Sequence, residues 1–157
     1  LSLSASDLYI VPGQLPGTAT NDSAAAGNVG EFISSTVLSG AAVSLTTDVA
    51  ANVTSIAISA GDWDVWGTVA FGSAGATTVS NAAGWISTTS AAYPTLPNEG
   101  AIYSVVAPYT TGNPPTVPVG QKRISVSISS TVFLTAQLGF AVSTATAYGF
   151  IGARRRR

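Results

Sequence analysis

The stretch Gly61-Asp62-Trp63-Asp64-Val65-Trp66-Gly67-Thr68-Val69-Ala70-Phe71 alternates between two kinds of side chain, as a half-buried β-strand does. Trp63, Val65, Val69 and Phe71 fall on one face, which is predicted to face a core. Two of the three tryptophans lie in this stretch, and aromatic rings bury the largest area per residue. We therefore expect this strand at the centre of a sheet.

The opposite face of the same strand carries Trp66 together with Asp62 and Asp64. A large ring that points away from the core indicates either contact with another chain or a platform for a ligand. The two carboxylates are expected about 7 Å apart along the strand, a separation that resembles a glycosidase pair. A solvated strand face is the simpler interpretation. The case for a calcium site is weaker still, because calcium needs about six to eight oxygen ligands and the sequence has no Asp-rich loop.

Composition narrows the class of protein. Only 8% of the 157 residues are charged, against about 25% in an ordinary soluble domain. A neutral, polar surface of this kind is associated with extracellular, capsid-like or obligately oligomeric proteins. Cysteine and histidine are absent, which excludes disulfides, the Ser-His-Asp triad and the usual zinc sites. No apolar run approaches the roughly 20 residues of a membrane helix, so membrane insertion is not expected.

Residues that favour turns are frequent in the segment 1–28, which contains Pro12-Gly13, Pro16-Gly17 and Gly27-Asn28. We expect this segment to be an extended arm that lies on another subunit or the junction to a preceding stalk. The chain starts without Met or a signal peptide, and we interpret it as the end of a longer polypeptide. Residues 29–157 are expected to form one domain.

Short apolar runs separated by Gly, Pro, Asn and Asp predict the fold of residues 29–157. Such spacing indicates an all-β protein, an antiparallel β-sandwich with a jelly-roll-like arrangement. Strands are expected at residues 32–38, 42–45, 53–58, 63–71, 76–89, 101–107, 124–128, 132–142 and 144–152. Residues 108–120, rich in Pro and Gly, are expected to form a long loop or edge.

The last predicted strand, residues 144–152, is apolar on both faces. Ala145, Ala147 and Ile151 lie on one side, and Tyr148 and Phe150 on the other. A strand of this kind is buried on both sides. The simplest arrangement places it between its own core and a partner subunit.

Aromatic side chains are candidate stacking platforms for sugar rings. Aromatic rings pack against the C–H faces of sugars, while side chains such as Asp64 bind hydroxyl groups. Core or interface positions are the alternative for Trp66, Trp85 and Tyr103, whereas Tyr93 and Tyr109 lie in Pro-rich segments that favour exposed loops. The candidates are Trp66, Trp85, Tyr93, Tyr109 and Asp64.

Four arginines, Arg154, Arg155, Arg156 and Arg157, end the sequence. Without them, seven acidic residues stand against Lys122 and Arg123, so the rest of the chain carries a charge of minus five. Phosphate would be repelled there, which argues against nucleic acid as a partner. We predict that the arginines meet carboxylates and clamp a neighbouring subunit, with bound anions as the second possibility.

Several of these motifs resemble the C-terminal domain of the tail fibres of tailed bacteriophages. The resemblance covers about residues 11–157. Gly152 departs from it, because a larger and often basic residue is expected there. The motifs are Gly61-Asp62-Trp63-Asp64-Val65-Trp66-Gly67, Trp85-Ile86-Ser87-Thr88-Thr89, the strand before Ser143-Thr144, and Ala147-Tyr148-Gly149-Phe150-Ile151-Gly152-Ala153-Arg154-Arg155.

The resemblance implies a homotrimeric fibre tip on the outside of the virion that binds a host surface glycan, a polysaccharide. In that setting Tyr148, Phe150 and the four arginines would stabilise the trimer. No enzymatic activity, cofactor or metal is expected. The alternative is a structural or decoration module of the virion without a receptor of its own. A polysaccharide depolymerase ranks third, with Asp62, Asp64, Asp48, Glu31 and Glu99 as its candidate carboxylates.

Overall fold

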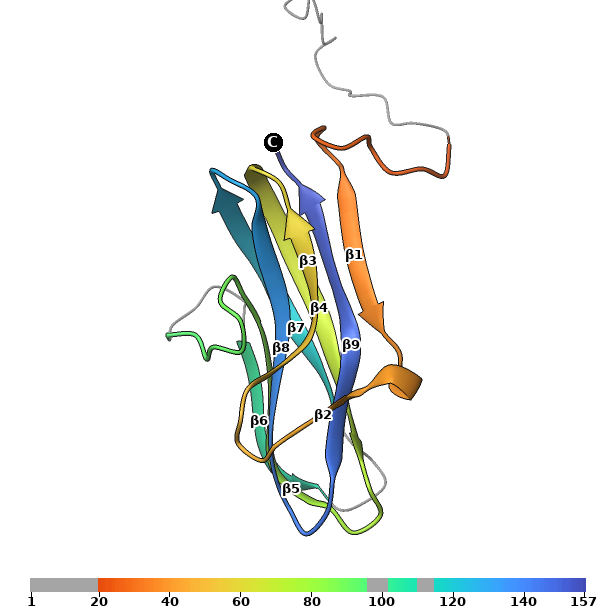
Figure 1. The fold of residues 1–157 in the computed structure, drawn as a ribbon, viewed down its shortest axis with the longest axis vertical. Coiled ribbons are helices and arrows are strands. Elements are labelled where there is room, and N and C mark those ends of the chain that lie inside the picture. The colour runs from red at the N-terminus through yellow and green to blue at the C-terminus, as the bar shows by residue number, and fades with distance from the viewer. Residues whose placement is uncertain (1–19, 96–101, 110–114) are drawn as a thin grey trace, which may run out of the picture.

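The computed structural model describes residues 20–95, 102–109 and 115–157. Within these ranges the chain is nearly all β, with a single short 3-10 helix (Figure 1). The elements are β1 (Phe32–Val37), η1 (Ser39–Ala41), β2 (Val43–Ser44), β3 (Ala51–Ile58), β4 (Gly61–Ser73), β5 (Thr78–Ser87), β6 (Ile102–Tyr109), β7 (Thr116–Val126), β8 (Ser130–Ala141) and β9 (Ala145–Arg155).

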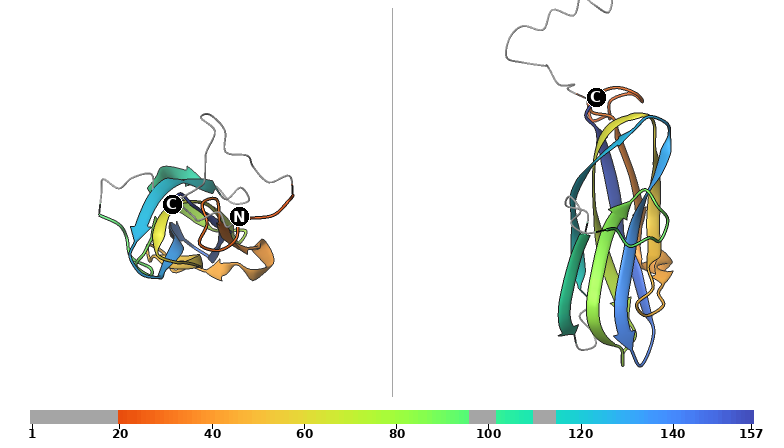
Figure 2. Two further views of the ribbon diagram at one scale, coloured as in Figure 1. Left: turned by 90° about the horizontal axis from the view of Figure 1, so that it is seen from above. Right: turned by 90° about the vertical axis from the view of Figure 1, so that its left-hand side faces the viewer.

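Two antiparallel sheets face each other. The first has the order β1-β9-β4-β7, with β2 also paired to β9, and the second has the order β3-β8-β5-β6. Seen from one end, the strands surround a common interior (Figure 2). The chain crosses between the sheets after β2, β3, β4, β6, β7 and β8, so most neighbours within a sheet are distant in sequence.

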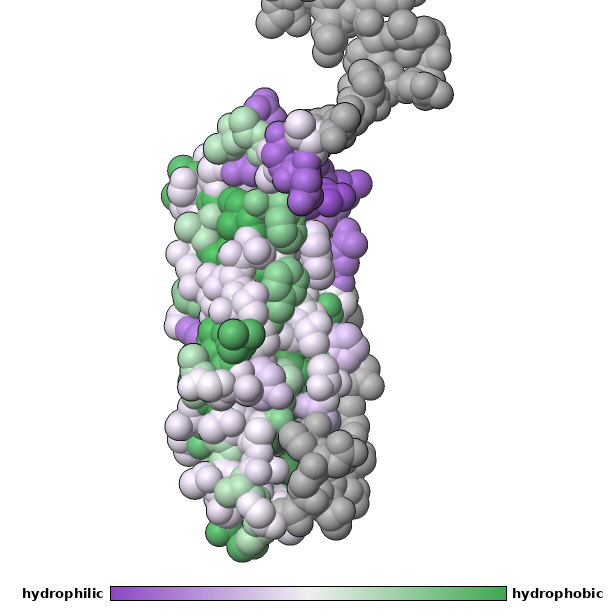
Figure 3. All heavy atoms as spheres, turned by 90° about the vertical axis from the view of Figure 1, so that its right-hand side faces the viewer, coloured by the Kyte–Doolittle hydropathy of each residue, from purple (hydrophilic) through white to green (hydrophobic). Residues whose placement is uncertain are grey.

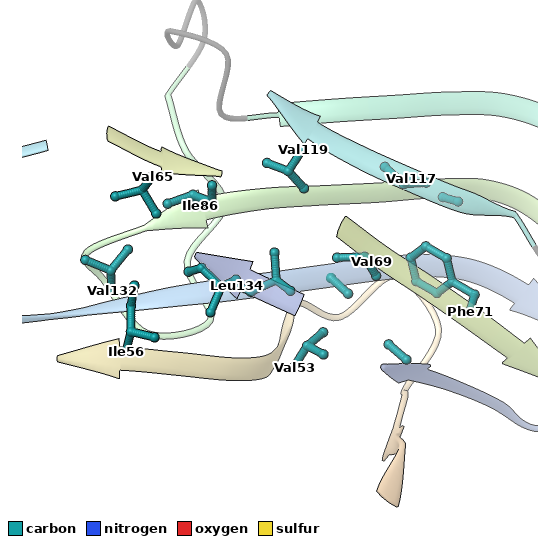
Figure 4. Close-up of a cluster of buried hydrophobic side chains, with 14 of the residues drawn as sticks. Val53, Ile56, Val65, Val69, Phe71, Ile86, Val117, Val119, Val132 and Leu134 are labelled. Carbon is teal, nitrogen blue, oxygen red and sulfur yellow. The ribbon is translucent and has the colours of Figure 1, made fainter. Parts of the chain in front are cut away.

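The core lies between the two sheets, and the side chains of β4 that the alternation predicts to be buried point into it. Trp63, Val65 and Val69 are fully buried, and Phe71 is 1% exposed. Fully burying an aliphatic or aromatic side chain stabilises a fold by about 1.5–3 kcal/mol. Figure 4 shows the central part of this core, contributed by both sheets: Val53, Ile56, Val65, Val69, Phe71, Ile86, Val117, Val119, Val132 and Leu134.

Residues 108–120 were predicted to form a long loop or an edge, and the described ends of this range lie in edge strands: β6 ends at Tyr109, and β7 begins at Thr116 and contains Pro118. β7 lies at the end of the first sheet's order, and an edge strand tolerates a residue without an N–H group. Its pairing with β4 shifts register between Val65 and Gly67. Residues 110–114 lie outside the described ranges.

Three predicted boundaries differ. β7 ends at Val126, so Ile128 lies in the following turn and is 73% exposed. β8 ends at Ala141, and Val142, at φ 79°, is 78% exposed rather than inward-facing. β9 continues past Gly152 to Arg155, so two of the arginines belong to the sheet.

Candidate functional site

Charged side chains gather at the end of the sandwich where the chain terminates. Figure 3 shows the most hydrophilic residues at this end, while the rest of the visible face is largely pale or hydrophobic. Four ion pairs lie there, and each joins an arginine to an acid of the same chain.

Arg155 is buried at this end, with a side-chain exposure of 5%. Its Nε donates to Glu31 Oε2 at 2.9 Å, its Nη1 donates to the carbonyl of Ala60 at 2.8 Å, and its Nη2 donates to Ser59 Oγ. The guanidinium carbon lies 4.4 Å from the centroid of the Trp63 ring. Glu31 also accepts a bond from the Gly27 N–H, and this bond together with Arg155 lowers the pKa of the carboxyl. The pair ties the end of β9 to the segment before β1.

Asp62 is the second buried acid and is 4% exposed. Arg123 donates to both of its oxygens, through Nε and Nη2, each at 2.8 Å. Arg157 Nε lies 3.2 Å from Asp62 Oδ2. The hydrogen bond from Arg123 is the main reason that the pKa of Asp62 is lowered. Three of the four arginines at the end of the chain, Arg155, Arg156 and Arg157, therefore pair with acidic groups of their own chain.

The outer face of the first sheet carries Trp66, which faces away from the core as predicted. Its ring stacks on Phe32 with centroids 5.9 Å apart. A Cβ at Gly152 would lie 2.9 Å from the Phe150 ring and 3.2 Å from the Phe32 ring. The absence of a side chain at Gly152, the departure from the tail-fibre pattern, thus leaves room for these rings. Tyr148 and Phe150 are half-buried in the single chain.

A hollow of about 410 Å³ opens beside Trp66 and is lined by Asp64, Gln121 and Arg154. Asp64 also faces Arg156, with 3.5 Å between Asp64 Oδ2 and Arg156 Nε. Asp64 and Trp66, two of the predicted receptor-binding residues, are therefore brought together on this sheet.

Trp85 lies in β5 of the other sheet, and Tyr93 lies in the segment that follows β5, on the far side of the core from Trp66. Trp85 is fully buried beneath the segment that follows β5, and its Nε1 donates to the carbonyl of Ala92 at 2.8 Å. Its assignment as a receptor-stacking ring is corrected, because no face of the indole is exposed. Instead it supports Tyr93 edge-on, with ring centroids 4.9 Å apart. Tyr93 is 51% exposed.

Asn52 on β3 anchors the segment that carries Tyr93. Its Nδ2 donates to Ser90 Oγ at 2.7 Å, and its Oδ1 accepts from the Ala91 N–H at 2.8 Å. The same oxygen accepts from Thr135 Oγ1 on β8 at 3.2 Å. The segment therefore runs across the outer face of the second sheet (Figure 2) and presents Tyr93 from a fixed position.

Next to Tyr93 lies a hollow of about 460 Å³ whose polar lining is Asp48, Asn81 and Gln137. Asn81 Nδ2 donates to Asp48 Oδ1 at 3.3 Å, and Gln137 Nε2 donates to the Asp48 carbonyl at 2.9 Å. A Cβ at Gly139 would lie 2.2 Å from Asn81 Nδ2 and 2.7 Å from Asp48 Oδ1. Gly139 on β8 is therefore needed for these side chains to converge.

The structure thus divides the predicted receptor-binding residues between two opposite faces. Asp64 and Trp66 share the first sheet, and Trp85 and Tyr93 share the second. Tyr109 belongs to β6 on the second sheet, where it pairs with Val79, and its side chain lies outside the described part of the structure, as does Glu99. The sequence did not predict Asn81 and Gln137 as site residues, because each is an isolated amide side chain within a strand and belongs to no recognisable motif.

The described residues contain no group of three or more acidic residues placed to hold a metal ion. No helix among them is long and apolar enough to cross a membrane. Comparison with known proteins found no matching protein family, curated protein or solved structure. The functional argument therefore depends on the residues and the geometry given above.

Proposed function

We propose that this chain is the receptor-binding tip domain of a bacteriophage tail fibre and that it binds a host surface polysaccharide. In this proposal it acts as a homotrimer on the virion, connected through its N-terminal segment to a fibre shaft. The observation that carries the binding role is the exposed Tyr93 ring beside Asp48, Asn81 and Gln137.

The geometry of this hollow fits a sugar. Binding sites for small ligands combine apolar surface with a few well-placed polar groups, and a sugar ring needs both. Tyr93 offers a ring face that is steadied by Trp85. Asp48 and Asn81 already bond each other, which fixes the directions of their remaining oxygen atoms toward a hydroxyl group. A positioned site of this kind loses little entropy on binding.

The strand order supports the proposal at the level of fold. The orders β1-β9-β4-β7 and β3-β8-β5-β6 fit a jelly roll, an architecture used by viral capsid proteins and lectins. Fold alone does not give function, so this is an analogy that adds weight to the resemblance in the sequence. Residues 20–31 lie at the same end as the C-terminus, so a shaft would join the domain there (Figure 1).

The geometry favours binding over hydrolysis. A depolymerase needs two carboxyl groups that flank one bond across a cleft, and one of them must hold a proton. Asp62 is buried against Arg123, and its pKa is lowered, which suits an ionised partner for arginine rather than a general acid. Glu31 is held in the same way by Arg155.

The alternative of a virion structural module is favoured by the outer face of the first sheet. Phe32, 38% exposed, stacks on Trp66 there, and Tyr148 and Phe150 lie half-buried on the neighbouring strand. Clustered aromatic rings on a surface are typical of subunit interfaces. We propose that this face contacts another copy of the chain. That role is compatible with ligand binding on the opposite sheet.

A glycan array of bacterial surface polysaccharides tests the receptor role. The parent chain should retain at least one polysaccharide, and Tyr93→Ala should weaken that binding by at least about tenfold, because a stacked ring carries a large share of affinity. Tyr93→Phe should bind nearly as the parent does, since the ring is kept. Ile128→Ala, at another exposed position, is the control. Retention of the same glycan by folded Tyr93→Ala would contradict the assignment, and no binding by the parent would favour the structural module.

A further inference from the structure

The hollow beside Tyr93 has a single charged side chain among its described lining residues, the carboxylate of Asp48. The positive charges of the chain lie elsewhere. All six lysines and arginines belong to β7, to β9 or to the two residues that follow β9: Lys122, Arg123, Arg154, Arg155, Arg156 and Arg157. Because β7 and β9 are strands of the first sheet, the second sheet has no lysine or arginine to place beside Asp48.

Asp48 is held in a defined position by three hydrogen bonds. Its N–H donates to the Leu138 carbonyl at 3.0 Å, its carbonyl accepts from Gln137 Nε2 at 2.9 Å, and its Oδ1 accepts from Asn81 Nδ2 at 3.3 Å. Its backbone has a φ of 57°, a left-handed conformation that Asp and Asn adopt more readily than most residues do. The carboxylate is therefore fixed in the lining from both its backbone and its side chain.

The hydrogen-bonding atoms that remain in this hollow are mostly acceptors. Within residues 20–95, 102–109 and 115–157, no hydrogen bond reaches Asp48 Oδ2, Asn81 Oδ1 or Gln137 Oε1. The two amide nitrogens, in contrast, already donate to Asp48. A ligand in the hollow therefore has to supply donors. A sugar hydroxyl or an amide N–H can do so, whereas a carboxylate is itself an acceptor and carries the same charge as Asp48.

We propose that the hollow at Tyr93 selects a non-acidic sugar unit, which offers hydroxyl or amide donors, and that Asp48 is the residue that excludes uronic acids and other acidic units. This inference rests on the proposed binding role of Tyr93 and defines the chemistry of the ligand. Specificity is a difference of affinities, so repulsion of the wrong ligand counts as much as attraction of the right one. Asp48 is exposed, and water weakens the repulsion, so the exclusion is about fivefold rather than absolute.

An array of bacterial surface polysaccharides in matched pairs tests the inference. The two members of a pair differ only at C6 of their hexoses, which is a primary alcohol in the neutral form and a carboxylate in the acidic form. The test variant is Asp48→Asn, which removes the charge, keeps an oxygen that can accept from Asn81 and suits the left-handed backbone. The matched control is Asp22→Asn, which removes the same charge at an exposed position in the segment before β1.

The parent should prefer the neutral form of the polysaccharide that it retains through Tyr93, by about fivefold or more. Asp48→Asn should reduce this preference to less than about twofold by binding the acidic form more tightly, because the repulsion is removed. Asp22→Asn should keep the parental preference, since the charge that it loses lies outside the hollow.

Two kinds of failure are distinguishable. Equal binding of both forms by the parent, with binding still lost in Tyr93→Ala, would overturn the selection by charge and leave the proposed binding role standing. The role of Asp48 would be overturned in the same way if folded Asp48→Asn kept the preference, changed it no more than Asp22→Asn does, or bound neither form. A parent that retains no polysaccharide in either form would contradict the proposed function itself, and this inference with it.

Discussion

Arg155 and Glu31 form a buried ion pair across 124 positions of sequence, with 2.9 Å between Arg155 Nε and Glu31 Oε2. The arginine also donates to Ala60 and Ser59 and lies over Trp63. One side chain thus connects the last strand, the turn before β4 and the segment before β1. We interpret it as a structural connection that holds both ends of the described chain together.

Replacing Arg155 with Met should be strongly destabilising, because it leaves the Glu31 carboxylate buried without its cation. Loss of one partner of a buried pair costs about 3 kcal/mol or more. Arg154→Met, at an exposed position of the same strand, is the control and should change stability little. Urea unfolding followed by tryptophan fluorescence measures both variants. Similar midpoints for the two variants would show that the buried pair has no special role.

Stability should fall in acid through Glu31 and Asp62. Both carboxyls have pKa values lowered in the folded chain, by hydrogen bonds from Gly27 and Arg155 for Glu31 and by Arg123 for Asp62. A lowered pKa means that the unfolded chain binds protons more readily, so this stabilisation is complete above the unfolded value, about 4, and is lost as pH falls through the folded value. Urea midpoints measured from about pH 7 downward should drop in this window. Glu31→Gln should show a smaller drop than the parent, and an identical pH profile would contradict the linkage.

The alternation within β4 was sufficient to predict its buried face, because period-two patterns depend only on neighbouring residues. The position of Trp85 could not be predicted in this way. Its ring points away from the core, and it is buried because the segment after β5 folds over it and is anchored by Asn52 on β3. Such burial depends on contacts that cross the sheet and leave no periodic signal.

The candidate sites show the same limit. Tyr93 was predicted because Pro-rich segments favour exposed loops, and it is exposed. Its companions Asp48, Asn81 and Gln137 come from three segments that the sandwich topology brings together, so no spacing in the sequence relates them. Likewise, the arginine run predicted carboxylate partners, and the pairing of β9 with β1 and β4 brings Glu31, Asp62 and Asp64 of the same chain to three of the arginines.

Gly139→Ala should weaken ligand binding at the Tyr93 hollow while the fold persists. The added methyl group would meet Asn81, Ser80 and Asp48 through side-chain atoms only, and these can move away without breaking the sheet. Their movement would separate the amide and carboxylate that are proposed to bind hydroxyl groups. Gly75→Ala, where the added atom meets nothing within 4 Å, is the control. Binding on the glycan array and urea unfolding are both measured, and unchanged affinity in Gly139→Ala would remove these residues from the site.

Self-association should depend on the outer face of the first sheet. Phe32→Asp places a charge in the aromatic cluster with Trp66 and should convert the proposed trimer to monomers, because an unpaired charge in an interface is costly. Tyr93→Asp makes the same chemical change on the opposite sheet and should leave the trimer intact. Sedimentation velocity measures the mass of each. A monomeric parent would reject the homotrimer, and dissociation by Tyr93→Asp alone would move the interface to the second sheet.

Removing Arg156 and Arg157 should lower thermal stability, and comparison with substitution separates two causes. The truncation loses the backbone bonds between Asp62 and residues 156 and 157 as well as the ion pairs to Asp62 and Asp64. The double variant Arg156→Gln, Arg157→Gln keeps the backbone bonds and loses only the charges. Exposed ion pairs are screened by salt, so the loss of Tm in the double variant, relative to the parent, should shrink as salt rises toward about 1 M.

The truncation should keep a Tm a few degrees below that of the parent at any salt concentration, since about 1 kcal/mol of stability corresponds to about 2–4 °C for a chain of this size. Calorimetry in low and high salt measures both, and a truncation with the parental Tm would show that the last two residues do not contribute to holding β4 and β9 together.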